Sequence, residues 1–177
     1  MAVKKTGYEI VSVDHDAYAS LREAREFHPD LVGAHIALAW RIRQRADKDG
    51  LLQIGKCVKV PDLQKEFAAW DFIIVLNQPV FIEFDSQQRV SLIDHELCHA
   101  RPRLDEKELQ LKDDRGRLVW RYRRHDIEEF REVIERHGCY KADLVELARA
   151  IFESNPSLAL EFPVEDPPGA GRIELPQ

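Results

Sequence analysis

Residues 93–100 of the chain read Ile93-Asp94-His95-Glu96-Leu97-Cys98-His99-Ala100. His95 and His99 are four positions apart, so on an α-helix their imidazoles lie on one face and can bind the same metal ion. Glu96 follows the first histidine, where a carboxylate can act as a general base beside that ion. This HExxH pattern is typical of zinc-dependent peptidases and predicts a zinc site at the two histidines and a catalytic role for Glu96.

The residues around this motif predict that it lies on an amphipathic helix. Apolar side chains recur at steps of three and four and form one stripe. They are Val90, Ile93, Leu97 and Ala100. A helix over residues 88–100, with Asp85-Ser86 at its N-terminus and Pro102 after its end, would bury this stripe. Both histidines lie off the stripe, so the same helix would turn them toward a cleft.

The length and composition are those of one globular domain. The chain has 177 residues, of which 44% are hydrophobic and 33% are charged, and this is enough for a sizeable core. The formal net charge of −6 argues weakly against general nucleic-acid binding, which usually needs a basic surface. A local basic cluster, Arg121, Arg123 and Arg124, is interpreted as a solvated strand end.

The sequence also predicts a soluble protein of a reducing compartment. No apolar run is long enough to span a membrane, and no hydrophobic stretch of a secretory signal follows the N-terminal lysines. Cys57, Cys98 and Cys139 are odd in number and form no CxxC pair, which fits a cytoplasmic protein rather than a disulfide framework. Cys98 is interpreted as a small buried hydrophobic residue.

Hydrophobic periodicity predicts strands and helices in alternation before the motif. The expected strands cover residues 8–13, 31–43, 51–60 and 71–77, and the expected helices cover about residues 14–27 and 61–70. Residues 31–43 also fit a helical stripe, and a strand is the preferred interpretation. Residues 71–77 are apolar on both faces, as in a central strand that is covered on each side. Residues 79–84 are expected to be a short connection.

After the motif the pattern indicates a β-hairpin followed by helices. The hairpin strands would cover residues 108–112 and 118–122, on either side of the turn signal Asp113-Asp114-Arg115-Gly116. The expected helices cover about residues 127–136 and 141–152.

The predicted domain covers residues 1–153. Residues 154–177 are rich in proline and glycine and predict a mobile tail or a strap.

Catalytic zinc normally takes three protein ligands, so one ligand besides the two histidines of the motif is expected. His125 is the best candidate, because it follows the predicted hairpin, which returns the chain toward its start. Asp126 could cap the next helix together with Glu129, and either could instead accept the free ring N–H of a ligand histidine. Glu128 and Glu129 are alternative third ligands. His137 is interpreted as a helix C-terminal residue that suits the dipole.

Two segments of the chain resemble a known protein family. They are Leu92-Ile93-Asp94-His95-Glu96-Leu97-Cys98-His99 and His125-Asp126-Ile127-Glu128-Glu129-Phe130. Together with the strand at residues 71–74 and with Gly138, they are similar to the putative phage metallopeptidase family over roughly residues 28–140. Members of this family occur in phages and in bacterial genomes, so the expected location is the cytoplasm of a bacterium or of a phage-infected host.

The resemblance implies a zincin-like α+β fold, in which a small mixed sheet precedes the HExxH helix and a β-hairpin and further helices follow it. It also implies one zinc ion bound by His95, His99 and His125, with Glu96 as the general base. The family is distantly similar to SprT-like and other minimal metalloprotease domains.

These expectations describe a zinc metalloendopeptidase acting on a protein or peptide. Tyr122, Tyr140 and Arg124 are candidates for stabilising the oxyanion, and the substrate is expected to lie extended along an exposed strand edge. One alternative is a non-catalytic domain in which zinc only holds the fold, with Cys98 or Cys139 as a fourth ligand. Another is a SprT-like DNA-associated protease, against which the acidic net charge counts.

Overall fold

The structure is a computed structural model, and it describes residues 7–43, 46–127 and 131–155. The chain forms two compact units, residues 1–124 and residues 125–177, and each is described by itself. The first unit contains the sheet and the HExxH helix. None of the described helices combines the length and the apolar character that a membrane crossing requires.

The first unit is built on a small mixed sheet, as the family resemblance implies. Its strands are β1 (Tyr8–Ile10), β2 (Ile36–Arg41), β3 (Gly55–Lys59) and β4 (Phe72–Asn77). Their order is β1-β2-β4-β3, with β2 parallel to β4 and the other two pairs antiparallel. The strand interpretation of the ambiguous segment 31–43 is therefore confirmed for its central part, and β3 is an edge strand.

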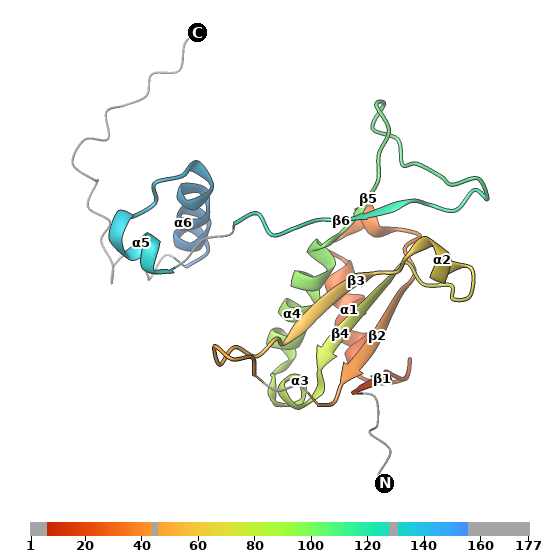
Figure 1. Ribbon diagram of the computed structural model, residues 1–177, viewed down its shortest axis with the longest axis horizontal. Coiled ribbons are helices and arrows are strands. Elements are labelled where there is room, and N and C mark those ends of the chain that lie inside the picture. Colours follow the sequence, from red (N-terminus) through yellow and green to blue (C-terminus); the bar gives the residue numbers. More distant parts are fainter. Residues whose placement is uncertain (1–6, 44–45, 128–130, 156–177) are drawn as a thin grey trace. The chain divides into compact units, whose positions relative to one another are not determined.

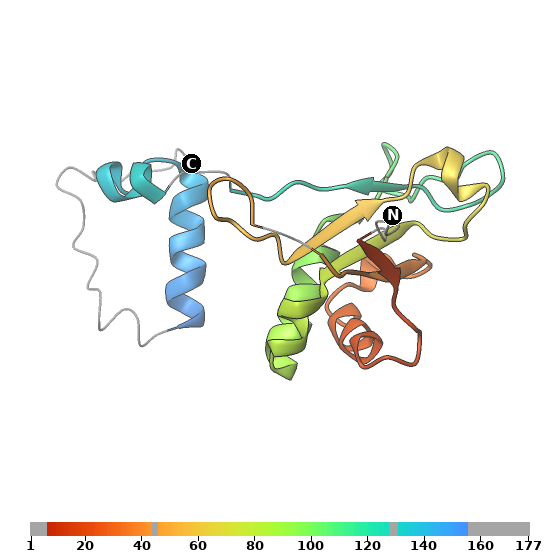
Figure 2. The same cartoon turned by 60° about the horizontal axis from the view of Figure 1, so that its bottom comes forward.

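Two helices, α1 (Ala17–Arg25) and α4 (Ser86–Cys98), lie side by side on one face of this sheet (Figures 1 and 2). The stripe of apolar residues predicted from the sequence is buried between α4 and the rest of the core. Asp85 caps α4, because its carboxylate accepts a hydrogen bond from the Gln88 backbone N–H (2.8 Å) while the Gln88 side chain accepts one from the Asp85 N–H (3.0 Å). The HExxH motif is thus at the C-terminal end of a helix that is anchored at both its start and its apolar face.

The central strand β4 is less covered than expected. Phe72, Ile74 and Leu76 are buried against the helices, whereas Ile73 and Val75 on the other face are only half-buried. Within the described residues of the first unit, no helix covers that second face. The prediction that β4 is a central strand is confirmed, whereas the prediction that both of its faces are covered is wrong.

Two segments next to the motif differ from their predictions. Residues 79–84 were expected to be a connection, but the helix α3 (Gln78–Glu83) covers most of them, because Pro79 suits the first helical turn and Phe81 is buried beneath it. The helix α4 ends at Cys98 rather than at residue 100, and the chain continues into β5 (Ala100–Pro102). The helix does not need Pro102 to end it, because the carbonyl oxygen of His99 accepts a hydrogen bond from the backbone N–H of Arg123 (2.7 Å).

The hairpin prediction placed the wrong partner beside the second strand. β6 (Trp120–Tyr122) pairs antiparallel with β5, with Ala100 opposite Tyr122. Of the expected pairing only an isolated bridge between Lys112 and Leu118 is formed, beside the turn at residues 113–117. Local alternation could not reveal this partner, since the side chain that fixes the pairing, Trp120, is buried against Phe72 of the sheet.

The remaining described elements are divided between the two units. In the first unit they are the 3-10 turn η1 (Pro29–Leu31) and the helix α2 (Asp62–Lys65). In the second unit they are α5 (Arg131–His137) and α6 (Ala142–Ser154), close to two expected helices. The first residues of the predicted helix 127–136, including Glu128 and Glu129, and most of the predicted tail lie outside the described residues.

Candidate metal centre

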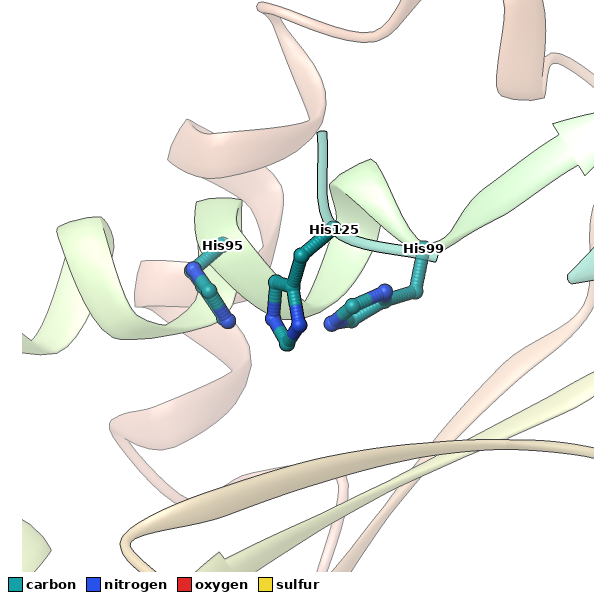
Figure 3. Close-up of side chains that lie close together, drawn as sticks. All are labelled: His95, His99 and His125. Atoms are coloured by element: carbon teal, nitrogen blue, oxygen red, sulfur yellow. The ribbon is translucent and has the colours of Figure 1, made fainter. Parts of the chain in front are cut away.

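Three histidines that the sequence singled out come together. His95 lies in the last turn of α4, His99 is the residue that caps this helix at its C-terminus, and His125 directly follows Arg124, the last residue of the first unit. Each offers one ring nitrogen, and these three atoms lie within 4.8 Å of one another. Figure 3 shows the three rings directed toward a common point. The helix supplies the spacing of the first two, and the chain leaving β6 supplies the third.

The orientation of His99 is fixed by the backbone next to β6. Its Nδ1 lies 2.7 Å from the carbonyl oxygen of Arg123, and since a carbonyl can only accept, Nδ1 carries the proton. This leaves Nε2 as the nitrogen with a lone pair for a metal ion. The ring of Tyr122 stacks on the His99 ring, with centroids 4.9 Å apart and planes 7° from parallel. The expected partner for a ligand ring N–H was a carboxylate, and for His99 the partner is this carbonyl instead.

Glu96 is buried beside the edge strand β3. The backbone N–H of Cys57 donates a hydrogen bond to its carboxylate. Gly55 makes this close approach possible, because a Cβ at this position would overlap Glu96 Oε1 and lie 3.0 Å from Leu92 Cδ1. Burial raises the pKa of the Glu96 carboxyl above its usual value, and the neighbouring His99 and the Cys57 N–H partly offset this effect. A carboxylate with a raised pKa in a buried position suits a general base.

Sequence reasoning did not find Gly55 or Cys57. Cys57 acts through its backbone N–H, which no side-chain pattern can reveal. A glycine within a predicted strand is a known sign of close approach by another group, so Gly55 carried a usable signal.

Of the three oxyanion candidates, Tyr122 is in contact with one of these histidines. Burial raises the pKa of its phenol, as do the nearby Cys57 and Glu96, while Arg124 opposes the shift. The hydroxyl therefore keeps its proton at neutral pH and can donate a hydrogen bond. Tyr140 belongs to the second unit, where Lys141 Nζ lies 5.1 Å from its ring centroid.

The cysteines differ widely in their surroundings. Burial, together with the charge of Glu96, raises the pKa of the Cys57 thiol to about 12, so this thiol stays protonated. Cys98 is half-buried rather than fully buried, and it forms a separate group with His28 and Asp94. Cys139 is exposed and belongs to the second unit. Among the described residues, the group of three histidines contains no cysteine.

A cleft of about 570 Å³ opens beside the first histidine of the motif. Its walls come from the segment before β3 and from the exposed side of α4, with His95 and Glu96 among the lining residues. Apolar and uncharged polar side chains make up most of the rest: Leu52, Gln53, Ile54, Phe84, Gln87, Gln88, Ser91 and Leu92. The arrangement can therefore hold a metal ion with a base beside it, at the end of a cleft open to a ligand.

Comparison with protein families places most of the chain in a described family. The model of a family described as "Putative phage metallopeptidase" matches residues 10–152, which include every one of the three histidines and Glu96. No curated protein matches the chain, and no solved structure matches it.

Proposed function

The chain belongs to the putative phage metallopeptidase family, and from this we propose that it is a zinc-dependent endopeptidase with a zincin-like fold. The observation that carries the proposal is the group formed by His95, His99 and His125 with Glu96 directly beside it. Three imidazole ligands with a fourth position left for solvent are characteristic of a catalytic rather than a structural zinc site. The expected fourth ligand of a structural site, a cysteine, does not join this group within the described part of the chain.

Each side chain has a distinct role in the proposed reaction. Zinc, when bound, would supply a Lewis acid that lowers the pKa of water, so that a hydroxide-like nucleophile is available at neutral pH. Glu96 takes a proton from the attacking water and later donates it to the leaving amine. Its raised pKa brings proton uptake and release closer to neutral pH.

Tyr122 is the residue best placed to stabilise the oxyanion. Its ring stacks on the ring of His99, one of the proposed zinc ligands. The raised pKa of its phenol keeps the hydroxyl protonated at neutral pH. A protonated phenol can donate a hydrogen bond to the negative oxygen that develops during attack.

The substrate is proposed to lie extended along β3. Among the described residues this strand has a ladder partner, β4, on one side, and the proposed position of the peptide strand is its other edge, next to α4. The Cys57 N–H on this edge donates to Glu96, so a peptide bound there would lie next to the proposed base. The neighbouring cleft has room for a substrate side chain, and its apolar and uncharged lining favours one without charge.

The test is the variant Glu96→Gln. We expect it to keep its zinc and to lose hydrolysis by a factor of about a hundred or more, since it cannot accept the proton. Zinc is measured by elemental analysis, and cleavage is measured on a peptide library by mass spectrometry. Glu83→Gln, which changes an exposed carboxylate on α3, is the matched control and should cleave like the wild type. Equal cleavage by Glu96→Gln and by the wild type would refute the catalytic assignment.

A further inference from the structure

We propose that α4 carries a second metal site, formed by His28, Asp94 and Cys98, which binds a divalent cation of the zinc class. The site lies entirely within the first unit and uses none of the residues assigned to the reaction. It does not depend on the proposed peptidase activity.

The helix positions two of these ligands in the same way as the first pair of histidines. Asp94 and Cys98 are also four residues apart on α4, each one position before His95 or His99. One position along an α-helix corresponds to a rotation of about 100°, so the two pairs point to different sides of the helix. His28 comes from the segment between α1 and η1, and it meets Asp94 and Cys98 with ligand atoms within 4.8 Å of one another.

His28 is a buried imidazole with incomplete hydrogen bonding. Its side chain is 4% exposed, and its Nε2 lies 2.6 Å from Asp94 Oδ1. Its Nδ1 has no hydrogen-bond partner in the described part of the chain. A buried polar atom without a partner costs free energy and is uncommon in folded proteins, so hydrogen bonding alone does not account for an imidazole at this place. The protein therefore places a buried imidazole beside two other potential metal ligands, Asp94 and Cys98.

The donor set determines which cation fits. A thiolate and an imidazole together favour zinc and similar ions over magnesium or calcium, which prefer oxygen ligands. Binding would replace the hydrogen bond between His28 Nε2 and Asp94 by bonds from both residues to the ion. The ring proton would move from Nε2 to Nδ1, so the imidazole stays neutral, and the proton of the Cys98 thiol would leave to solvent. The charges of Asp94, the Cys98 thiolate and a divalent cation then cancel, so no net charge is buried.

An ion can reach this group from solvent, and once bound it would connect two parts of the first unit. The Asp94 side chain is 39% exposed and opens the group to solvent, while His28 forms its buried side. An ion bound here would connect the segment after α1 to the last turn of α4. These two helices pack directly against each other, so the ion would hold α4 in place next to its other metal site.

The experiment is a cobalt(II) titration of the full-length protein, followed by its absorption spectrum. A cobalt–thiolate bond gives a near-ultraviolet charge-transfer band, and three histidines do not. We expect the wild type to show this band and Cys98→Ser to lose it. Cys139→Ser, which removes an exposed cysteine of the second unit, is the matched control and should keep the band. Absence of the band from the wild type, or its survival in Cys98→Ser, would overturn the proposal.

Two further variants separate this site from the proposed catalytic one. The double variant His95→Ala/His99→Ala should keep the thiolate band, and its zinc content should fall from two ions per chain to one. Asp94→Asn preserves the shape of the side chain. In this variant the cobalt dissociation constant measured from the thiolate band should rise about tenfold or more. An unchanged affinity in Asp94→Asn would also contradict the proposed ligand set. A protein that shows the band but cleaves no peptide would leave the second site standing and refute only the proposed function.

Discussion

Two features of β3 determine where the Glu96 carboxylate lies, and neither is a reactive side chain. The Cys57 N–H fixes one direction of the carboxylate, and the missing side chain of Gly55 provides the space that it occupies. At the scale of single residues, the position of the base thus depends on a backbone group and on an absent Cβ. Two substitutions test how closely the proposed reaction depends on such positions.

Gly55→Ala should reduce peptide hydrolysis without removing zinc. The added Cβ would overlap Glu96 Oε1, so either the carboxylate or β3 must move. A displacement of about 1 Å can lower the rate about a hundredfold. Peptide cleavage and zinc content are measured on the same samples. Gly7→Ala, whose Cβ would lie 3.9 Å from the Arg43 carbonyl oxygen, an ordinary van der Waals distance, should behave like the wild type. Full activity of Gly55→Ala would show that the Glu96 position seen here is not the one used in the reaction.

Tyr122→Phe should lower kcat about a hundredfold and leave zinc content unchanged. The substitution keeps the aromatic ring that stacks on His99 and removes only the hydroxyl. Loss of one oxyanion donor typically costs this much in kcat, with a smaller effect on KM. Steady-state kinetics on a cleaved peptide measure both constants, with Tyr8→Phe on β1 as the control. If kcat stayed the same, the oxyanion donor would have to be sought elsewhere, beginning with Arg124.

At the scale of elements, the short ribbon of β5 and β6 fixes the C-terminal end of α4, where His95 and His99 lie. The Arg123 N–H binds the His99 carbonyl oxygen and the Arg123 carbonyl oxygen binds the His99 ring, so the end of α4 is tied to this ribbon twice. Trp120 anchors the ribbon to the sheet through Phe72, with ring centroids 6.2 Å apart. The ribbon is therefore needed both for the orientation of His99 and for the path of the chain to His125.

Trp120→Ala should destabilise the fold by about 3–5 kcal/mol, the usual cost of removing a buried tryptophan side chain. The indole is only 1% exposed, so its loss leaves a cavity under the ribbon. Zinc affinity should fall as well, because β6 positions His99. Urea unfolding and zinc competition measure the two effects. Leu109→Ala, in the exposed loop between β5 and β6, should change neither. If the variant bound zinc more weakly but unfolded at the wild-type urea concentration, the predicted contribution of Trp120 to fold stability would be wrong.

The elements also show what the sequence could predict. Strong periodicity identified α4, the central place of β4 and the alternation of strands and helices before the motif, because each pattern is contained in one segment. The pairing of β5 with β6 joins residues separated by a loop and depends on the burial of Trp120, which no local pattern records. The helix α3 escaped prediction because it is short and begins at a proline.

The same distinction applies to the candidate site. His95, Glu96 and His99 follow from spacing on one helix, and His125 followed from the expected return of the chain after a hairpin. The structure brings these histidines together, although the hairpin has a different first strand. The contributions of Gly55, Cys57 and the Arg123 carbonyl depend on tertiary contacts and could not be read from residue types alone.

At the scale of the whole molecule, the proposed zinc site joins the neighbouring pair His95 and His99 to His125, which lies 26 positions after His99 in the chain. His125 is therefore the residue whose removal should test the tertiary arrangement. His125→Ala should weaken zinc binding more than about a hundredfold, since even residues that only support a ligand contribute tenfold to a hundredfold. The measurement is a zinc competition titration in the Cys98→Ser background, which isolates the histidine site from the second group.

His137→Ala is the control for this prediction, because it removes a histidine from the end of α5 that does not belong to the group. Zinc affinity that is unchanged in His125→Ala would move the third ligand elsewhere, first to Glu128 or Glu129. These two carboxylates lie outside the described residues, so the variants Glu128→Gln and Glu129→Gln would then be measured next.

The place of the HExxH motif at the very end of α4 has an electrostatic consequence. The aligned peptide dipoles of a helix leave a partial negative charge at its C-terminus, and this charge attracts cations within the last turn. His95, Cys98 and His99 lie in that turn or directly after it, and Asp94 directly precedes it. A cation bound there would interact favourably with the helix backbone as well as with its ligands. Metal affinity and the stability of this last turn are thus thermodynamically linked, and whatever frays the turn weakens the hold on the ion.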